Sequence, residues 1–361
     1  MKLGYSPSHT LASIESSTVS HKSSRSTAPY RAALIGCGAV GSLLSEDPLR
    51  RGAVPTHAEA YANSQRAKLI AVCDADASRL QRCGKKWRVP AQYADFSRMI
   101  REQSPEIVSV CTPDATHAEI LEGLLEEANG IKAIWCEKPL TTNVAQAQQL
   151  SARAAARGIL LAVNYTRRYL EDIRRLKQFM QKAELGAVQA VSGWYTKGVL
   201  HNGSHWFDLL RLLVGEVERV RAFDRLKEAG SDPTLDVRLW LGNGVVAHLQ
   251  AANDAHYAIF EMDLLTTHGR ILLTEFATRA RLFRAQPSSR FTGYSELVEM
   301  KPDWASARSR PANSLALEDL LSALENSHAP ACTAADGMAA LKIAVAALDS
   351  AREGREVALA P

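Results

Sequence analysis

The chain has 361 residues, and because domains average about 150 residues, this length favours two domains over one. Lysine and arginine number 43 against 39 aspartate and glutamate, so the formal net charge is +4, with 23% of residues charged and 46% hydrophobic. This globular composition excludes the dense basic surface of a nucleic-acid-binding protein and a disordered polyelectrolyte. No apolar run reaches the 18 or more residues of a membrane helix, so we expect neither a membrane nor a nucleic-acid partner. Six cysteines without a CxxC pair indicate reduced thiols and a cytoplasmic protein.

Residues 1–29 differ from the rest of the chain, because they contain nine Ser and three Thr but few large apolar residues. They lack the apolar core of a secretory signal peptide. Many Ser and few acidic residues give a weak similarity to an organelle transit peptide, although Arg25 is the single arginine of the segment. We therefore predict a flexible Ser/Thr-rich tail.

Short apolar runs separated by helical patterns follow from residue 30 to residue 162. The runs are apolar on both faces and rich in β-branched residues, as parallel strands covered by helices must be. They lie at 31–35, 68–73, 106–111, 131–136 and 159–163. This alternation predicts a doubly wound α/β domain with a parallel sheet over 30–162.

After residue 170 the strand-like stretches follow one another closely, with one helix, 204–214, between them. The stretches lie at 188–196, 217–223, 235–241, 245–251, 259–266, 270–276 and 280–283. Glycine-rich turns such as 242–244 join several of them as hairpins. We predict an α+β domain over 163–330 with an open, mainly antiparallel sheet, and a C-terminal helix and tail over 331–361 that packs back across both domains.

The first apolar run ends in a GxGxxG motif. Its residues are Gly36, Cys37, Gly38, Ala39, Val40 and Gly41. Such glycines permit a tight turn and let the backbone approach a pyrophosphate at a helix N-terminus, as in a dinucleotide-binding Rossmann domain. The second run ends in Asp74, a position where a carboxylate binds the adenosine ribose and repels a 2′-phosphate, and Ala75 follows in place of an arginine. We therefore expect these residues to bind NAD, with NADP disfavoured, and leave open a glycine turn without a ligand.

The distance between the glycines and this acid is unusual. Asp74 lies 38 positions after Gly36 (74 minus 36), whereas the usual separation is about 20. The additional residues are loop-like, which predicts an insertion over 42–56 beside the first helix.

Further motifs occur in order in both halves of the chain. The first domain contains His57-Ala-Glu-Ala60, Cys111-Thr112-Pro113 followed by His117, and Cys136-Glu137-Lys138-Pro139, and the second contains Gly203-Ser-His205-Trp-Phe-Asp208. With the glycine motif, this set resembles the Gfo/Idh/MocA oxidoreductases, the relatives of glucose-fructose oxidoreductase and inositol dehydrogenase. The resemblance covers about residues 30–358 and implies a second domain that binds substrate and forms a homo-dimer or homo-tetramer through its sheet. It also implies that Thr112, Pro113, His117, Glu137 and Lys138 contact the cofactor.

Lys138 and His205 are the predicted catalytic residues. Oxidation of a secondary alcohol by NAD needs a group that takes the hydroxyl proton. Lys138 follows a predicted strand, at the edge where open α/β sheets bind ligands, and burial there lowers the pKa of an amine. The resemblance gives His205 the role of acid and base, or of a hydrogen-bonding partner to the reacting oxygen. The open alternative for Lys138 is a surface lysine before a helix.

A further group of residues is expected to surround the substrate, namely Lys138, Arg168, Trp194, Tyr195, His201, Asn202 and His205. Arg168 suits a carboxylate or phosphate, and Trp194 and Tyr195 suit stacking on a sugar ring. His201 stands where inositol dehydrogenases have an aspartate, which predicts a different sugar-like or anionic substrate. The two aromatic residues equally suit a solvent-facing sheet or a subunit contact, and His201 equally suits a loop. We expect no metal site.

The sequence therefore predicts an NAD-dependent oxidoreductase that transfers a hydride between the nicotinamide and a secondary alcohol or ketone of a sugar-like or polyol substrate, in carbohydrate or polysaccharide metabolism. Two alternatives stay open. One is a non-catalytic NAD-binding regulatory member of the family, and the presence of both Lys138 and His205 argues against it. The other is a reductase of a dihydrodiol or another non-sugar carbonyl.

Overall fold

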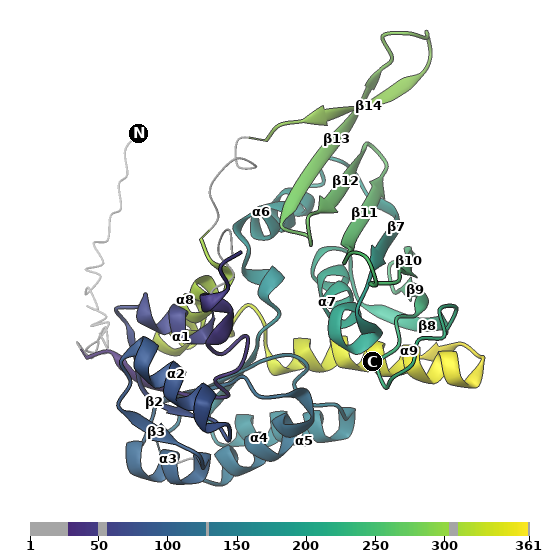
Figure 1. The fold of residues 1–361 in the computed structure, drawn as a ribbon. Helices are drawn as coiled ribbons and strands as arrows, with labels where there is room; N and C mark the ends of the chain where they lie inside the picture. The colour runs from purple at the N-terminus through teal and green to yellow at the C-terminus, as the bar shows by residue number, and fades with distance from the viewer. Residues whose placement is uncertain (1–27, 50–55, 128–129, 303–309, 360–361) are drawn as a thin grey trace, which may run out of the picture.

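The computed structural model describes residues 28–49, 56–127, 130–302 and 310–359. The predicted tail therefore lies outside the described residues except for its last two positions, and so do positions 50–55 of the predicted insertion. Figure 1 shows two domains, the first from purple to blue and the second from teal to green.

The first domain contains a six-stranded parallel sheet in the order β3-β2-β1-β4-β5-β6, which confirms the predicted Rossmann architecture. Its strands are β1 Tyr30–Ile35, β2 Ala67–Cys73, β3 Ala91–Tyr93, β4 Ile107–Val110, β5 Ala133–Cys136 and β6 Leu160–Val163. Its helices are α1 His57–Ala62, α2 Ala77–Trp87, α3 Phe96–Gln103, α4 His117–Glu126 and α5 Val144–Ala156. The strand order reverses between β1 and β4, and open α/β sheets bind ligands at the carboxyl edge of such a switch point.

The second domain contains a nine-stranded sheet in the order β14-β13-β12-β11-β7-β10-β9-β8-β15, in which β7 and β10 are parallel and every other pair is antiparallel. This confirms the prediction of a mainly antiparallel sheet in the second domain. Its strands are β7 Val188–Tyr195, β8 Val217–Phe223, β9 Asp236–Leu241, β10 Val246–Ala251, β11 Phe260–Thr266, β12 Gly269–Thr274, β13 Arg279–Pro287, β14 Ser295–Met300 and β15 Val357–Ala358, with helices α6 Glu171–Gln181 and α7 Ser204–Leu213. Two shorter helical segments, η3 Thr166–Tyr169 and the π-helical turn η4 Gly198–Gly203, carry residues of the site.

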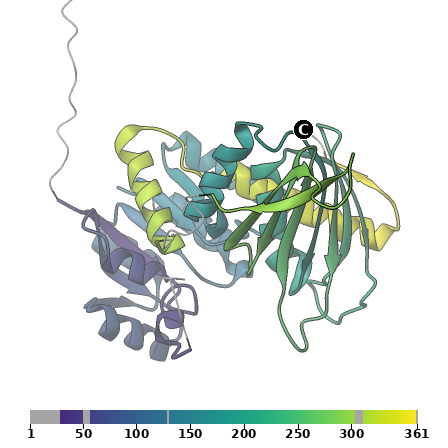
Figure 2. The same ribbon diagram turned by 90° about the horizontal axis from the view of Figure 1, so that it is seen from above.

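Helix α8 (Ala312–Asn326) lies within the range predicted for the second domain, 163–330, but packs on the first domain. Its apolar side packs into the first core through Leu315, Leu317, Leu320 and Leu321. It contacts α1 and β5, and in the view from above it lies on the side of the first domain (Figure 2). The chain therefore returns after β14 to cover an apolar surface of the first domain, before its last strand, β15, joins the second sheet.

Helix α9 (Ala334–Glu353) joins the two cores. Its first half contributes Ala340 and Leu341 to the core of the first domain, and its second half contributes Ile343 and Ala347 to that of the second. It contacts α5 and β6 on one side and α7 and β8 on the other, and Figure 1 shows it in yellow below the second sheet. The helix thereby holds the two sides of the inter-domain site in a fixed relation.

Candidate functional site

The glycine turn after β1 leaves open space at one of its three glycines. Gly36 has φ +93°, and a Cβ there would lie 2.6 Å from the Cys111 carbonyl carbon, so glycine is required. A Cβ at Gly41 would lie 2.0 Å from the Gly36 carbonyl oxygen. A Cβ at Gly38 would meet no atom within 4 Å. The turn is closed at Gly36 and Gly41 and open at Gly38, where a pyrophosphate needs close approach to the backbone.

A cavity of about 680 Å³ lies beside this turn, within the range of small-ligand sites. Asp74, directly after β2, accepts hydrogen bonds from the amides of Cys37 and Asp76 at 2.7 and 2.8 Å, which fixes its carboxylate at the cavity rim. The predicted contacts that line the cavity are Gly36, Gly38, Ala39, Val40, Asp74, Thr112 and Pro113. The open glycine, the fixed carboxylate and the volume fit a dinucleotide.

The cavity is also lined by residues that the motifs did not indicate, including Asp76, Arg79, Phe96, Thr116 and Glu119. Of these, Asp76 had a local signal, because it caps α2 by accepting from the Ser78 and Arg79 amides. The others enter the cavity only because the sheet brings β2, β4 and the start of α3 together.

Two residues of the glycine turn that are predicted cofactor contacts, Cys37 and Gly41, do not line the cavity. Cys37 is fully buried, with its Sγ 3.8 Å from the Cys73 carbonyl oxygen, and Gly41 packs against the carbonyl of Gly36. Both residues hold the turn together, and their contact with the cofactor stays a prediction. Cys37 acts through its amide, which holds Asp74.

Helix α1 begins against the glycine turn although many residues separate the two in sequence. The amides of His57 and Ala58 donate to the carbonyl oxygens of Val40 and Gly41 at 3.1 and 3.0 Å. The described part of the intervening segment includes a short 3-10 helix, η1 Leu43–Glu46. The helix therefore keeps its place at the turn, and the additional residues explain the long separation between Gly36 and Asp74.

Glu137, the residue before Lys138, takes part in a buried hydrogen-bond network. Its Oε1 lies 3.0 Å from His57 Nε2 and accepts from Asn164 Nδ2 at 2.6 Å, while His57 Nδ1 lies 3.1 Å from Ser109 Oγ. Burial raises the pKa of Glu137, but the hydrogen bonds from His57 and Asn164 outweigh it, so the net shift is downward. The carboxylate is thus held by internal partners, and its contact with the cofactor stays a prediction.

His117 connects two loops of the crevice. It is fully buried, and its ring nitrogens lie 2.7 Å from the Pro139 carbonyl oxygen and 2.9 Å from that of Thr112. Burial lowers the pKa of this imidazole, but nearby Cys136 and the two carbonyls outweigh it and raise the pKa to about 10. His117 therefore positions Thr112 and the loop after β5, and its direct contact with the cofactor stays a prediction.

Lys138 reaches from the end of β5 to the second domain. Its Nζ donates to the His201 carbonyl oxygen at 2.9 Å and lies 3.3 Å from His201 Nδ1. The lysine is 8% exposed, and burial lowers its pKa although the Glu137 carboxylate opposes the shift. An ammonium with a lowered pKa more readily gives up a proton, as a catalytic lysine requires.

His205 stands at the start of α7 with an unused ring nitrogen. The residue is 9% exposed, its ring makes an edge contact with Tyr165 at 5.2 Å between centroids, and Nδ1 has no partner among the described residues. Burial, with the positive charges of Arg167 and Lys138, lowers the pKa of His205 well below its ordinary value. The imidazole is therefore neutral at physiological pH, and it lies near the lysine.

Arg168 does not face the cleft. Its Nε donates to both carboxylate oxygens of Asp208 at 2.9 Å, and its terminal nitrogens donate to the Ala331 carbonyl and to Asp336 at 2.9 and 3.1 Å. The side chain is 6% exposed and its donors are held by internal partners, so the structure gives Arg168 a structural role, and its predicted substrate contact stays untested. The preceding residue, Arg167, is the arginine that acts electrostatically on Lys138 and His205.

Three further residues predicted to contact the substrate have other surroundings in the structure. The Tyr195 hydroxyl is buried and hydrogen-bonds the amide and carbonyl of Leu235 at 2.7 and 2.9 Å. Trp194 is 40% exposed and points to the opposite face of the sheet, because its neighbour Gly193 packs against Trp206 of α7. Asn202 Nδ2 donates to the Thr196 carbonyl at 2.8 Å, so this amide fixes η4.

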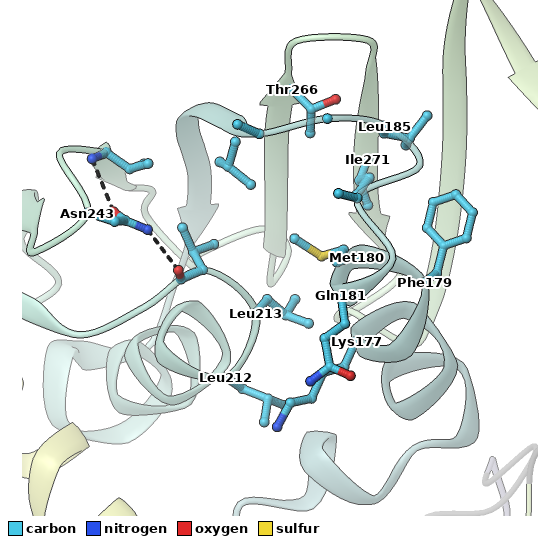
Figure 3. Close-up of a pocket in the computed structure, with 16 residues that line it drawn as sticks. Lys177, Phe179, Met180, Gln181, Leu185, Leu212, Leu213, Asn243, Thr266 and Ile271 are labelled. Carbon is cyan, nitrogen blue, oxygen red and sulfur yellow. Dashed lines mark hydrogen bonds between the residues drawn. The ribbon is translucent and has the colours of Figure 1, made fainter.

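A second cavity of about 490 Å³ lies in the second domain. Figure 3 shows Lys177 and Gln181 of α6, Leu212 and Leu213 of α7, and Thr266 of β11 around it. Among the described residues that line this cavity, Lys177 alone has a titratable side chain. Its walls are mainly apolar, so it offers no set of groups for proton transfer.

Within the ranges that the structure describes, no group of three His, Cys, Asp or Glu residues is arranged to hold a metal ion. Over the same residues, none of the helices combines the length and the apolar character that crossing a bilayer requires. All six cysteines are buried and free.

The fold and the crevice define a dinucleotide-binding oxidoreductase of two domains. A model described as an oxidoreductase family with an NAD-binding Rossmann fold matches residues 30–165, and a model of the C-terminal alpha/beta domain of the same family matches residues 193–359. The chain belongs to the Gfo/Idh/MocA oxidoreductase family, as its motifs predict.

Relatives match over different shares of their length. The chain is 22% identical to a myo-inositol 2-dehydrogenase of Thermotoga maritima over 355 residues, which is 91% of this chain and 98% of that protein. It is 28% identical to a D-glucoside 3-dehydrogenase of Escherichia coli over 200 residues, which is 52% of this chain and about half (53%) of that enzyme. The WlbA dehydrogenase of Bordetella pertussis, solved with NADH and UDP-GlcNAcA, has a TM-score of 0.73 at 18% identity, covering 92% of this chain and 99% of that one.

Proposed function

We propose that this protein oxidises a secondary alcohol, or reduces the corresponding ketone, of a sugar-like or polyol substrate with NAD as the hydride carrier. The observation that carries the proposal is the pair Lys138 and His205. The two residues come from different domains, both are buried, and the lysine charge lowers the pKa of the histidine. Lys138 also follows β5 at the carboxyl edge of the sheet, the same edge at which the glycine turn and Asp74 lie.

A nicotinamide bound at this edge would supply the hydride acceptor. Lys138 Nζ in its neutral form takes the proton of the substrate hydroxyl while the carbon gives up its hydride, so the alcohol loses two electrons and two hydrogens and becomes a ketone. The neutral His205 ring hydrogen-bonds the reacting oxygen and holds it toward the lysine. In the reduction direction the Lys138 ammonium returns the proton.

His201 supports the exit of this proton to solvent. Lys138 is buried, and its Nζ has His201 Nδ1 at 3.3 Å, whereas the His201 residue is exposed. Burial and the positive charge of Lys138 lower the pKa of His201, so its ring is neutral and accepts a proton at Nδ1. The imidazole that replaces the usual aspartate thus connects the catalytic amine with water.

The cavity rim favours NAD over NADP. Asp74 and Asp76 place two carboxylates at the end of β2, where a 2′-phosphate would lie. Arg79 also lines the cavity, but its Nε lies 3.5 Å from an Asp76 carboxylate oxygen, so its charge is partly compensated.

A sugar-like or polyol substrate is supported by the relatives. The Thermotoga maritima and Escherichia coli proteins are named as dehydrogenases of an inositol and of glucosides, and both substrates carry several secondary hydroxyl groups. The surroundings of Trp194 and Tyr195 do not support the predicted stacking wall, so recognition depends on polar side chains of the cleft.

The test is a turnover assay at 340 nm in which NAD and a panel of sugars, inositols, sugar acids and nucleotide sugars are offered to the protein. We expect at least one member to reduce NAD. If NADH binds but no member of the panel is oxidised, the catalytic proposal fails and a regulatory, non-catalytic function is favoured. Turnover of dihydrodiols alone would favour the non-sugar alternative.

The quaternary structure and the compartment stay predictions. Assembly as a homo-dimer or homo-tetramer would use the outer face of the nine-stranded sheet, on which Trp194 and Leu265 are exposed. A cytoplasmic location agrees with six free cysteines.

A further inference from the structure

Arg167 is held in place by two contacts from the second domain. Its guanidinium carbon lies 3.8 Å from the centroid of the Phe260 ring, and its Nε donates to the Phe276 carbonyl oxygen at 3.0 Å. Phe260 begins β11, and Phe276 lies in the turn between β12 and β13. Stacking on a ring together with one hydrogen bond fixes the plane of a guanidinium group.

The turn that provides this carbonyl has an unusual backbone. Glu275, Phe276 and Ala277 have φ values of +53°, +61° and +59°, a left-handed conformation that residues with a Cβ rarely adopt. Ala277 is fully buried and anchors the turn, and the Thr278 amide donates to the Glu275 carbonyl at 3.2 Å. Three consecutive residues keep a left-handed conformation only where the surrounding contacts hold them in it. Backbone strain of this kind concentrates at ligand-binding positions.

The two terminal amino groups of Arg167 have no hydrogen-bond or ion-pair partner among the described residues. Its side chain is partly exposed. The nearby Asp208 carboxylate is bound on both oxygens by Arg168, so it does not neutralise Arg167. Burial lowers the pKa of Arg167 to about 10, although Asp208 opposes the shift, and the guanidinium is therefore charged at neutral pH.

Arg167 lies two residues after Tyr165, whose ring contacts the His205 ring at 5.2 Å between centroids, so it belongs to the segment that packs against the proposed reaction centre. Arg167 is close enough to Lys138 and His205 for its charge to lower the pKa of both. The carboxylates of Glu137, Asp114 and Asp232 act on the charge of Lys138, whereas no carboxylate of the described residues forms an ion pair with the Arg167 charge. An anionic group on the ligand would compensate it.

We propose that Arg167 binds a carboxylate of the substrate, so that the substrate class is a sugar acid or other polyhydroxy acid. This inference rests on the proposed function, because it names the substrate of the same cleft. A guanidinium with a fixed plane and two free amino groups matches the planar, bidentate geometry of a carboxylate. A phosphate has more charge and usually gathers several donors or a helix N-terminus, and this cleft offers a single arginine near the lysine and histidine.

The test measures binding to the NADH-saturated protein by calorimetry, with matched acid and neutral probes. The pairs are D-gluconate with D-glucitol, D-glucuronate with D-glucose, and D-galacturonate with D-galactose, and D-glucose 6-phosphate serves as the phosphate probe. We expect at least one acid to bind about tenfold or more tightly than its neutral partner. Arg167→Met should remove this advantage, and Arg167→Lys should keep part of it, because lysine retains the charge without the planar fork. Arg157→Met, at an exposed arginine after α5, is the control and should behave as the wild type.

Several results would overturn the inference. Equal or tighter binding of the neutral partners, an absence of binding in both classes, or an acid preference that persists in Arg167→Met would each do so, and strongest binding of the phosphate would overturn the carboxylate assignment. An unchanged NADH affinity shows that Arg167→Met is folded. Lys138-dependent turnover of neutral polyols alone would refute this inference and leave the proposed function standing. Arg167-dependent binding of acids without turnover of any panel member would refute the proposed function instead.

Discussion

The two sides of the proposed active site, one from each domain, are built differently. On the cofactor side, formed by the glycine turn, Asp74 and the loops after β4 and β5, the polar groups bind one another, as Cys37 with Asp74 and His117 with Thr112 show. On the substrate side, formed by Arg167, His201 and His205, groups lack partners in the described structure, namely His205 Nδ1 and the terminal nitrogens of Arg167.

This difference indicates how each side recognises its ligand. A dinucleotide is bound mainly by backbone shape, so the cofactor side needs rigid turns whose side chains are already satisfied. A substrate that must be oriented to within a fraction of an ångström needs hydrogen-bond donors and acceptors that are not already paired within the protein. Burying such unpaired groups costs free energy, so an active site contains few of them. Lys138 lies between the two sides and contacts both domains.

The largest effect should follow from removing the group between the two sides. Lys138→Ala should lower kcat by about two to four decades, the scale of a lost general acid or base, and leave NADH affinity roughly unchanged. Steady-state kinetics and NADH titration measure the two quantities on one preparation. An unaltered kcat would refute the assigned role.

The cofactor side could be predicted from sequence because local signals encode it. Gly36 and Gly41 are required by the backbone itself, and Asp74 ends a strand that its own apolar residues define. The contacts predicted at Cys37, Glu137 and His117 stay predictions. These motif residues also serve buried networks, and a motif does not distinguish a residue that touches the ligand from one that holds the turn.

The substrate side could be predicted only in part. Lys138 and His205 follow from motifs, but the choice between two adjacent arginines depends on partners far along the chain. Arg168 is bound by Asp208 and Asp336, whereas Arg167 meets Phe260 and the turn after β12. No local pattern contains these contacts, because tertiary packing alone decides which of two neighbours faces the cleft.

The next largest effect is expected from substituting Arg168 and Arg167 in turn, and it is measured as a change in the free energy of unfolding. Arg168→Met leaves the buried carboxylate of Asp208 without its partner and should cost about 3–5 kcal/mol. Arg167→Met removes a stacking contact and should cost about 1 kcal/mol or less. Denaturant titration of both variants measures the difference. Equal losses would show that Arg167 is as structural as its neighbour.

A smaller effect is expected on the cofactor side. Gly38→Ala adds a methyl group into open space, so the melting temperature should stay unchanged while the Kd for NADH rises about tenfold, equivalent to about 1.4 kcal/mol. In Gly41→Ala the new Cβ would collide with the Gly36 carbonyl oxygen, so this variant should lose both stability and binding. Normal NADH affinity in Gly38→Ala would place the pyrophosphate elsewhere.

The smallest effect is a shift of the midpoint in the pH profile of kcat/KM, set by the lowered pKa of Lys138. Because Lys138 must be unprotonated to accept the hydroxyl proton, kcat/KM for oxidation should rise with pH, with a midpoint below the ordinary lysine pKa of about 10.4. For reduction the sign reverses, since the ammonium donates the proton, and kcat/KM should fall across the same midpoint. His205 should add no limb near its ordinary pKa of about 6.5, because its pKa is far lower. A limb near 6.5 that His205→Gln abolishes would contradict its neutral state.

The central claim, hydride transfer within this cleft, is tested most directly by following deuterium from substrate carbon to cofactor. The protein is incubated with NAD and carbon-deuterated D-glucose, D-glucuronate and myo-inositol, and the nicotinamide product is analysed by mass spectrometry. We expect reduced cofactor carrying one deuterium with the wild-type protein, and a loss of about two decades or more in its rate of formation with Lys138→Ala. Cofactor that binds but never acquires the label from any deuterated candidate would contradict the account.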